Sequence, residues 1–156
     1  MYDVKSMQTF LKKRLSHERY IHTMNVAKEC RRLAEIYGED PEKAYFAGMV
    51  HDICKEDPKQ QQYDWAVKSK MGFCAEEAGS WKVWHGVAGA YFLKTNFEVY
   101  DEDILNAVRF HTIARKNMSL LEKIVYLGDM TSEERDYGGV DIMRKACADS
   151  LEKGML

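Results

Sequence analysis

Apolar residues recur every three or four positions along most of the chain, and no long run alternates between apolar and polar residues. The first pattern is typical of amphipathic helices and the second of half-buried strands, so the sequence predicts an all-α fold. We expect helices over residues 6–15, 17–37, 41–55, 58–70, 81–94, 101–111, 119–130 and 140–153, with a looser region over 72–80.

Capping residues mark several of these boundaries. Ser16 can accept a hydrogen bond from the first turn of the second helix, and Gly38 can end that helix in a left-handed conformation. Asp40-Pro41 and Asp57-Pro58 each combine a capping side chain with a proline suited to the first turn, and Ser119 can cap a later helix. The expected helices therefore have local start and stop signals.

One domain accounts for the length of 156 residues, and no linker, repeat or low-complexity segment divides the chain. The formal net charge of −2 excludes strong nonspecific affinity for nucleic-acid backbones. No apolar run is long enough for a transmembrane helix, and the amphipathic start lacks the apolar core of a secretory signal. We expect a single helical bundle over 1–156, with no nucleic-acid or membrane partner.

The four cysteines are far apart and form no CxxC pair, which excludes a zinc ribbon and a thioredoxin-like motif. Cys54 follows His51 by three residues and could approach a site there, but a buried reduced thiol is the simpler interpretation. Reduced cysteines make the cytoplasm the natural compartment.

Histidine and aspartate residues form an ordered series along the chain, H…HD…H…H…D. Imidazole and carboxylate are ligands of Zn, Mn and Fe, and six of them exceed what one small ion usually takes from a protein. If they converge, they suit two metal ions that share a carboxylate, an arrangement used to hydrolyse phosphate esters. The six residues are His22, His51, Asp52, His85, His111 and Asp129.

The surroundings of these residues strengthen that interpretation. Asp52 follows the apolar run 44–50, and Asp129 ends the apolar segment LLEKIVYLGD, so both aspartates are expected at buried helix ends without an adjacent Lys or Arg. A buried carboxylate needs a cation, and a metal would satisfy both. The alternative is a structural helical domain whose histidines are core residues with hydrogen bonds. His17, in a polar stretch, is expected at the surface.

Three segments of the chain resemble the HD-domain phosphohydrolases, and in particular the YqeK subgroup of bacterial HD proteins. They are RYIHTMNVAKECRRLAEIYG, KAYFAGMVHDICK and HTIARKNMSLLEKIVYLGDMTSEERDYGGV, and the resemblance spans residues 10–145. It implies a helical HD domain, a di-iron centre and symmetrical hydrolysis of diadenosine tetraphosphate. The chain departs from the subgroup at Ala114, where glycine is usual, and at Ser132-Glu133-Glu134, where Glu-Pro is usual. Members of the subgroup also tend to run further at the C-terminus.

The resemblance implies roles for single residues. His22, His51, Asp52 and Asp129 would hold one ion, and His85, His111 and the shared Asp52 carboxylate would hold the second. A metal-activated water would attack phosphorus, with iron as the expected metal and manganese or zinc as alternatives.

Cations are expected to grip the polyphosphate beside the metals. Lys55 and Arg135 are assigned to catalysis together with Asp52, and both are also expected to bind substrate. Arg19, Thr112 and Arg115 match the family pattern and are expected to contact substrate. Trp81, Trp84 and Tyr137 could stack on a base, although packing is the simpler interpretation of Trp84.

We therefore expect a phosphoric-anhydride hydrolase that converts diadenosine tetraphosphate into two ADP. The alternatives are an HD phosphohydrolase for another nucleotide or phosphoester, and an inactive nucleotide-sensing module. Retention of all six candidate ligands together with Lys55 favours an enzyme over a sensor. An apolar face on the last helix is compatible with a homodimer.

Overall fold

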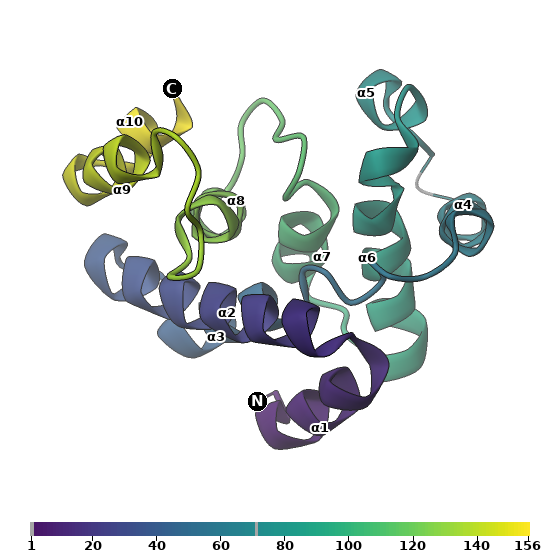
Figure 1. Ribbon diagram of the computed structural model, residues 1–156. Coiled ribbons are helices and arrows are strands. Elements are labelled where there is room, and N and C mark those ends of the chain that lie inside the picture. Colours follow the sequence, from purple (N-terminus) through teal and green to yellow (C-terminus); the bar gives the residue numbers. More distant parts are fainter. Residues whose placement is uncertain (1, 71) are drawn as a thin grey trace.

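The computed structural model describes residues 2–70 and 72–156, and every regular element in that part of the chain is helical (Figure 1). The all-α prediction is confirmed. The predicted domain 1–156 also includes Met1 and Met71, which lie outside the described residues. The elements are α1 (Val4–Arg14), α2 (His17–Tyr37), α3 (Pro41–Val50), α4 (Lys59–Lys68), α5 (Ala75–Ala78), the 3₁₀ turn η1 (Trp81–Val83), α6 (Trp84–Phe97), α7 (Glu102–Arg109), α8 (Leu120–Thr131), α9 (Val140–Asp149) and α10 (Leu151–Met155).

Local capping explains most helix ends. The Ser16 side chain accepts from the Arg19 amide at 3.2 Å, and Gly38 ends α2 with a φ of 85°. The Asp40 carboxylate accepts from two amides of the first turn of α3, and Ser119 caps α8 in the same way. These predicted signals are confirmed, since each needs only residues that are neighbours in the sequence.

Three predicted boundaries are wrong. The helix expected to reach residue 55 ends at Val50 and continues as tight turns, with Lys55 N bonded to Asp52 O at 2.9 Å. Asp57 does not cap α4, because its carboxylate pairs with Arg14 instead. The last helix is interrupted at Ser150, whose extended backbone separates α9 from α10 and whose hydroxyl caps α10.

The core is centred on α3, which contacts α2, α7 and α8 and is buried from Ala44 through Val50. Because all sides of α3 are covered, its apolar residues form a continuous run rather than one stripe. In Figure 1, α8 lies above α2 and α3, α7 lies between α8 and α6, and α4 packs on the outer side of α6. α3 and α7 contact each other, and both contact α8.

Small residues allow these helices to approach closely. A β-carbon at Gly48 of α3 or Gly128 of α8 would lie 2.8 or 2.6 Å from Cys30 Sγ of α2. A β-carbon at Gly86 of α6 would lie 2.4 Å from the Arg109 carbonyl oxygen of α7. Gly86 therefore lets α6 approach α7 closely beside His85.

Among the described residues, no helix combines the length and apolar character needed to cross a bilayer.

Candidate metal centre

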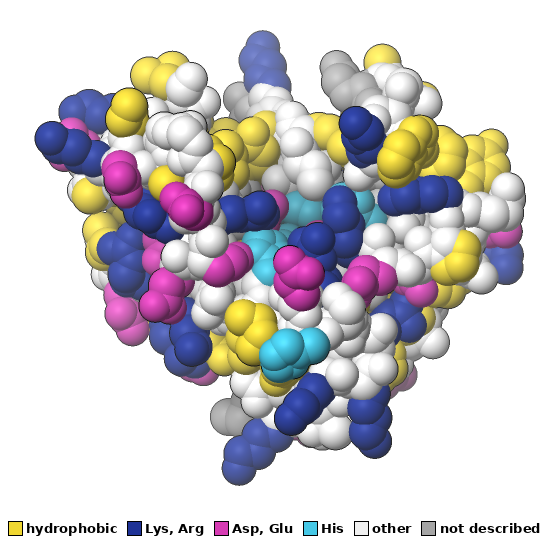
Figure 2. All heavy atoms as spheres, in the orientation of Figure 1, with side chains coloured by type: hydrophobic (Ala, Val, Ile, Leu, Met, Phe, Trp, Pro, Cys, Tyr) yellow, Lys and Arg dark blue, Asp and Glu magenta, His cyan; other side chains and the backbone are white. Residues whose placement is uncertain are grey.

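The six histidine and aspartate residues converge from five helices. His22 lies on α2, His51 and Asp52 follow α3, His85 is on α6, His111 follows α7, and Asp129 is near the end of α8. All four histidines and Asp52 are buried, and Asp129 is partly accessible. Figure 2 shows histidine side chains in the middle of one face of the molecule, flanked by Lys, Arg, Asp and Glu side chains.

Asp52 is at the centre of this cluster and directs its two oxygens to different histidines. Its Oδ2 lies 3.3 Å from His51 Nε2 and 3.7 Å from His22 Nε2. Its Oδ1 lies 3.3 Å from His85 Nε2 and 3.2 Å from His111 Nε2. A single carboxylate thus borders two separate groups of nitrogen donors.

Asp129 completes the first group. Its Oδ1 is 3.0 Å from His22 Nε2 and 3.6 Å from His51 Nε2. In the second group the Nε2 atoms of His85 and His111 are 3.1 Å apart. Donor atoms of His22, His51 and Asp129, and likewise of His51, Asp52 and His111, lie within 4.8 Å of one another.

Hydrogen bonds fix the orientation of three histidine rings. His51 Nδ1 donates to the Gly48 carbonyl and His111 Nδ1 to the Val108 carbonyl, both at 2.6 Å, and His22 Nδ1 donates to the Glu134 carboxylate. Because carbonyl oxygens only accept, the proton is on Nδ1 and Nε2 faces the cluster.

The Nε2 atoms of His22 and His51 are buried and make no hydrogen bond of acceptable geometry among the described residues. Oriented imidazole nitrogens of this kind, beside carboxylate oxygens, suit divalent cations that accept nitrogen and oxygen ligands. The donor set therefore fits two ions, one for each oxygen of Asp52.

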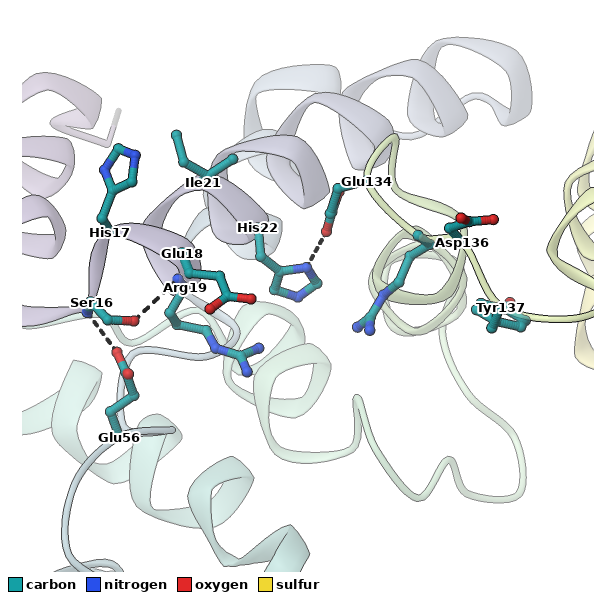
Figure 3. Close-up of a pocket in the computed structure, with 11 residues that line it drawn as sticks. Ser16, His17, Glu18, Arg19, Ile21, His22, Glu56, Glu134, Asp136 and Tyr137 are labelled. Carbon is teal, nitrogen blue, oxygen red and sulfur yellow. Dashed lines mark hydrogen bonds and ion pairs between the residues drawn. The ribbon is translucent and has the colours of Figure 1, made fainter.

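Glu134 belongs to the site and was not identified from the sequence. It lies in the loop between α8 and α9, where Ser132 Oγ donates to its Oε1 at 2.9 Å and His22 contacts the same oxygen (Figure 3). Burial tends to raise the pKa of Glu134, but the hydrogen bond from His22 lowers it overall. The only sequence signal was the unusual Ser-Glu-Glu segment, which gave no indication of its contact with α2.

Two arginines compensate the aspartates. Arg19 Nη1 lies 3.0 Å from Asp52 Oδ2, and Arg135 Nη2 lies 2.8 Å from Asp129 Oδ1. Neither aspartate has an adjacent Lys or Arg in the sequence, but the fold brings Arg19 to Asp52 and Arg135 to Asp129. Buried carboxylates are stabilised by such pairs, so the cluster alone does not demand a metal.

A cleft of about 760 Å³ opens beside His22, between the first turns of α2 and the loop after α8 (Figure 3). Arg19 and Arg135 both line it, as do Ile21 and Tyr137. The Tyr137 hydroxyl donates to the Met130 carbonyl at 2.9 Å, which holds its ring at the cleft. His17 is exposed, as predicted, and also lines this cleft.

The remaining predicted substrate contacts differ in their placement. Lys55 is half-buried and makes no ion pair among the described residues, and its charge lies close enough to His85 to help lower the pKa of that histidine. Thr112 has a buried hydroxyl without a hydrogen-bond partner in the described part of the chain. Arg115 instead forms a two-pronged pair with Glu122 at 2.9 and 2.6 Å. Its predicted role in substrate binding is not supported by this placement.

Two of the other candidates, Cys54 and Trp84, are packing residues. Cys54 is fully buried and its thiol is approached by Arg14, so it is a buried reduced thiol rather than a member of the cluster. Trp84 packs with Tyr63 and Phe73 and donates from Nε1 to the Glu77 carbonyl at 3.0 Å. Trp81, by contrast, is 53% exposed.

Burial and neighbouring charges shift the pKa values of His51 and His85 in opposite directions. Burial opposes protonation of His51, but the carboxylates of Asp52 and Asp129 raise its pKa to about 10. Burial lowers the pKa of His85 to about 4, and the neighbouring His111 contributes to that decrease. Burial would raise the pKa of Asp52 and of Asp129, but contacts with the histidines keep both well below the usual value. The two carboxylates therefore favour a proton on His51, whereas burial disfavours one on His85.

Comparison with known proteins gives an independent assignment. Residues 19–133 match the HD domain family. The chain is 36% identical over 146 residues to the symmetrical bis(5'-nucleosyl)-tetraphosphatase of Bacillus subtilis (strain 168), covering 94% of this chain and 78% of that protein. It is 31% identical over 142 residues to the enzyme of the same name from Staphylococcus aureus (strain NCTC 8325 / PS 47), covering 91% and 73%.

A solved structure agrees with the fold. The 1.50 Å crystal structure of a protein from Clostridium acetobutylicum, described as a predicted HD superfamily hydrolase involved in NAD metabolism, is 38% identical and superposes with a TM-score of 0.94. The comparison covers 99% of this chain and 82% of that one. Family, sequence relatives and architecture agree, and the chain belongs to the HD domain family, whose members depend on divalent metals.

Proposed function

We propose that this protein hydrolyses diadenosine tetraphosphate symmetrically into two ADP, with two divalent metal ions held by the histidine and aspartate cluster. The observation that carries the proposal is the position of Asp52, whose two oxygens face two separate pairs of imidazole Nε2 atoms. The names of the relatives from Bacillus and Staphylococcus support the substrate and the reaction.

The ligand assignment follows the distances. His22, His51 and Asp129 would hold one ion with Asp52 Oδ2, and His85 and His111 would hold the other with Asp52 Oδ1. When bound, such ions supply Lewis acidity toward phosphate oxygens and lower the pKa of a water molecule toward neutral pH. Imidazole and carboxylate donors without thiolate fit iron or manganese, with zinc possible. Iron is proposed because the resemblance to the YqeK subgroup implies a di-iron centre.

The protein's own residues have four tasks. Asp52 holds both sites at a fixed separation, and Glu134 holds the His22 ring so that Nε2 faces the cluster. Arg19 and Arg135, which pair with the aspartates, are placed at the cleft where they can turn to substrate phosphates. Lys55 is available to stabilise charge that develops in the transition state.

The cleft beside His22 would take one nucleotide half of the substrate. Its volume of about 760 Å³ is in the range of nucleotide-sized ligand pockets, and it offers two guanidinium groups and the Tyr137 ring. We extend the proposal to the whole chain, 1–156, as one HD domain working in the reducing cytoplasm, which agrees with four free cysteines. A homodimer is compatible with the exposed Ile142 of α9.

Product analysis tests the proposal. Protein reconstituted with ferrous iron under anaerobic conditions is given diadenosine tetraphosphate, and the products are separated by chromatography. ADP as the sole product is expected, and a chelator or Asp52→Ala is expected to abolish its formation while helical content is retained.

Other products would change the assignment. ATP plus AMP would contradict symmetrical cleavage, and turnover of other nucleotides alone would change the substrate. Metal binding without any turnover across a nucleotide panel would contradict the enzyme and favour the sensing module. Full activity of Asp52→Ala would contradict the site.

A further inference from the structure

Two lysines lie beside an exposed tryptophan near the start of the helical segment that carries His85. Lys55 lies in the turn after His51-Asp52, where its amide donates to the Asp52 carbonyl at 2.9 Å, and Lys59 is the first residue of α4. Lys59 Nζ lies 4.9 Å from the centre of the Trp81 ring, and Lys82 Nζ lies 5.9 Å from it. Trp81 precedes His85 by four residues at the start of the same helical segment.

These lysines carry uncompensated charge. Lys55, Lys59 and Lys82 form no ion pair with any described residue, and the only side-chain hydrogen bond of Lys59 in that part of the chain is to Gln62 at 3.5 Å. Burial lowers the pKa of Lys59, and the charge of Lys55 lowers it further. A protein gains no stability from neighbouring like charges, whereas an anion between them would be bound favourably.

Trp81 differs from the tryptophan three residues later. Trp84 is enclosed by Tyr63 and Phe73 and satisfies its indole N–H. Trp81 leaves 53% of its surface exposed, an unusual fraction for the largest apolar side chain. Figure 2 shows hydrophobic and cationic side chains adjoining the histidines on the α4 and α5 side of this face.

We infer that Trp81, Lys55 and Lys59 form a second nucleotide subsite, in which Trp81 stacks on a nucleobase while the two lysines contact the phosphates that lead to the metal centre. The inference rests on the proposed function. Symmetrical cleavage requires the two nucleosides to extend in different directions from the central phosphoanhydride. The cleft takes one half beside His22, and Trp81 lies on the helical segment that carries His85, a member of the other group of candidate metal ligands.

The chemistry of this surface fits a nucleoside polyphosphate. Indole rings bind bases through their π-faces with little sequence preference, and ammonium groups bind phosphate oxygens as point charges. Lys55 adjoins the candidate ligand Asp52 through its backbone, and Lys59 adjoins the Trp81 ring. A cation–π pair between Lys59 and Trp81 also holds the ring in place before a ligand arrives.

Binding of an uncleavable ligand provides the direct test. The methylene-bridged analogue of diadenosine tetraphosphate, with carbon in place of the central bridging oxygen, is titrated into the metal-loaded protein by calorimetry. Trp81→Ala is expected to raise the dissociation constant about tenfold, and Trp81→Phe to restore most of the affinity. Tyr100→Ala, at another exposed aromatic residue, is the matched control and should not change binding.

Steady-state kinetics separates a binding role from a structural one. Trp81→Ala and Lys59→Gln are expected to raise KM for diadenosine tetraphosphate about tenfold with kcat and metal content unchanged. Lys68→Gln on the same helix is the control. Adenosine tetraphosphate, which has one nucleoside and can place it in the cleft, should be much less sensitive to Trp81→Ala.

The outcomes distinguish this inference from the proposed function. Analogue affinity and KM that are unchanged in Trp81→Ala overturn the inference even if ADP is formed. Loss of metal in Trp81→Ala also overturns it, because it indicates a structural role. Binding of the analogue that depends on Trp81, without formation of ADP by the wild type, supports the subsite and refutes the hydrolase. Failure of the wild type to bind the analogue overturns both.

Discussion

The guanidinium of Arg19 lies 3.0 Å from the same oxygen of Asp52 that faces His51 and His22. Arg135 is related to Asp129 in the same way at 2.8 Å. The protein thus supplies its own counter-ions for the two carboxylates that would bind metal. Because a bound divalent ion would neutralise the carboxylates, metal loading would release the arginines for contact with substrate phosphate.

Replacing Arg19 by glutamine tests this exchange. Without metal, Arg19→Gln is expected to lower the free energy of unfolding by roughly 1–3 kcal/mol, because the buried Asp52 loses a partner. With metal bound, we expect unchanged metal content and a KM about tenfold higher. Arg32→Gln, which removes the exposed pair with Glu29 on the same helix, should leave KM unchanged. Loss of metal from Arg19→Gln would contradict the exchange.

Metal stoichiometry tests the shared carboxylate. His85→Gln removes a donor from only one group, so it is expected to retain about one ion per chain. Asp52→Asn weakens both groups and is expected to lose both ions, with hydrolysis abolished in each case. Metal analysis of protein purified with excess metal and then desalted gives the count. Two ions retained by Asp52→Asn would refute the bridging role.

The contact between α6 and α7 controls the second group. In Gly86→Ala, the new methyl group would lie 2.4 Å from the Arg109 carbonyl oxygen, so the helices must separate. We expect a loss of roughly 1–3 kcal/mol in stability and weaker binding of one of the two ions. Gly138→Ala, where a β-carbon meets nothing within 4 Å, is the control. Thermal unfolding and metal titration measure the two effects, and unchanged behaviour of Gly86→Ala would contradict the tight contact.

Arg115 is expected to contribute to stability rather than to substrate binding. Its partner Glu122 is almost fully buried, so Arg115→Gln leaves that carboxylate without its cation. We expect a loss of roughly 1–3 kcal/mol in the free energy of unfolding and unchanged kcat/KM. Denaturant unfolding and steady-state kinetics on the same preparation decide between the roles. A large rise in KM at unchanged stability would restore the role expected from the sequence.

The stability of the metal-free protein is expected to depend on pH in both directions. The folded pKa of His51, raised to about 10 from 6.5, gives stability that is complete below pH 6.5 and is lost as the pH rises toward 10. The pKa of His85, lowered to about 4, gives stability that is lost as the pH falls from 6.5 toward 4. Unfolding measured across this range should therefore show a maximum near pH 6.5.

Two variants test whether His51 causes the alkaline decline in stability. His51→Gln should remove the alkaline decline, whereas replacement of the exposed His17 should change neither limb. A flat profile for the wild type between pH 6.5 and 10 would show that the carboxylates do not hold a proton on His51.

Helix boundaries could be predicted where they depend on adjacent residues. Ser16 and Gly38 act on amides and carbonyls within one turn, so the sequence alone locates both ends of α2. Asp57 and Ser150 could not be interpreted in this way. The first is drawn away from its local capping position by Arg14 of another helix, and the second interrupts a segment whose apolar pattern is continuous.

At the candidate site too, some features could be predicted from the sequence and others could not. The types and order of the six residues identify candidate ligands, because few other arrangements require buried histidine and aspartate together. The orientation of the rings depends on carbonyls such as those of Gly48 and Val108, which become acceptors only when α3 and α7 end where they do. Glu134 becomes a partner of His22 only once its loop lies against α2.

The position of the Cys30 side chain restricts which substitutions homologues of this protein can accept at two glycines. Its sulfur fills the space between Gly48 and Gly128, where a methyl group on either glycine would come within 2.8 or 2.6 Å of it. A larger residue at position 48 or 128 is therefore tolerable only with a smaller one at position 30, so the three positions should covary among homologues. Selection on the spacing of His22, His51 and Asp129 would thus constrain residues that carry no chemistry of their own.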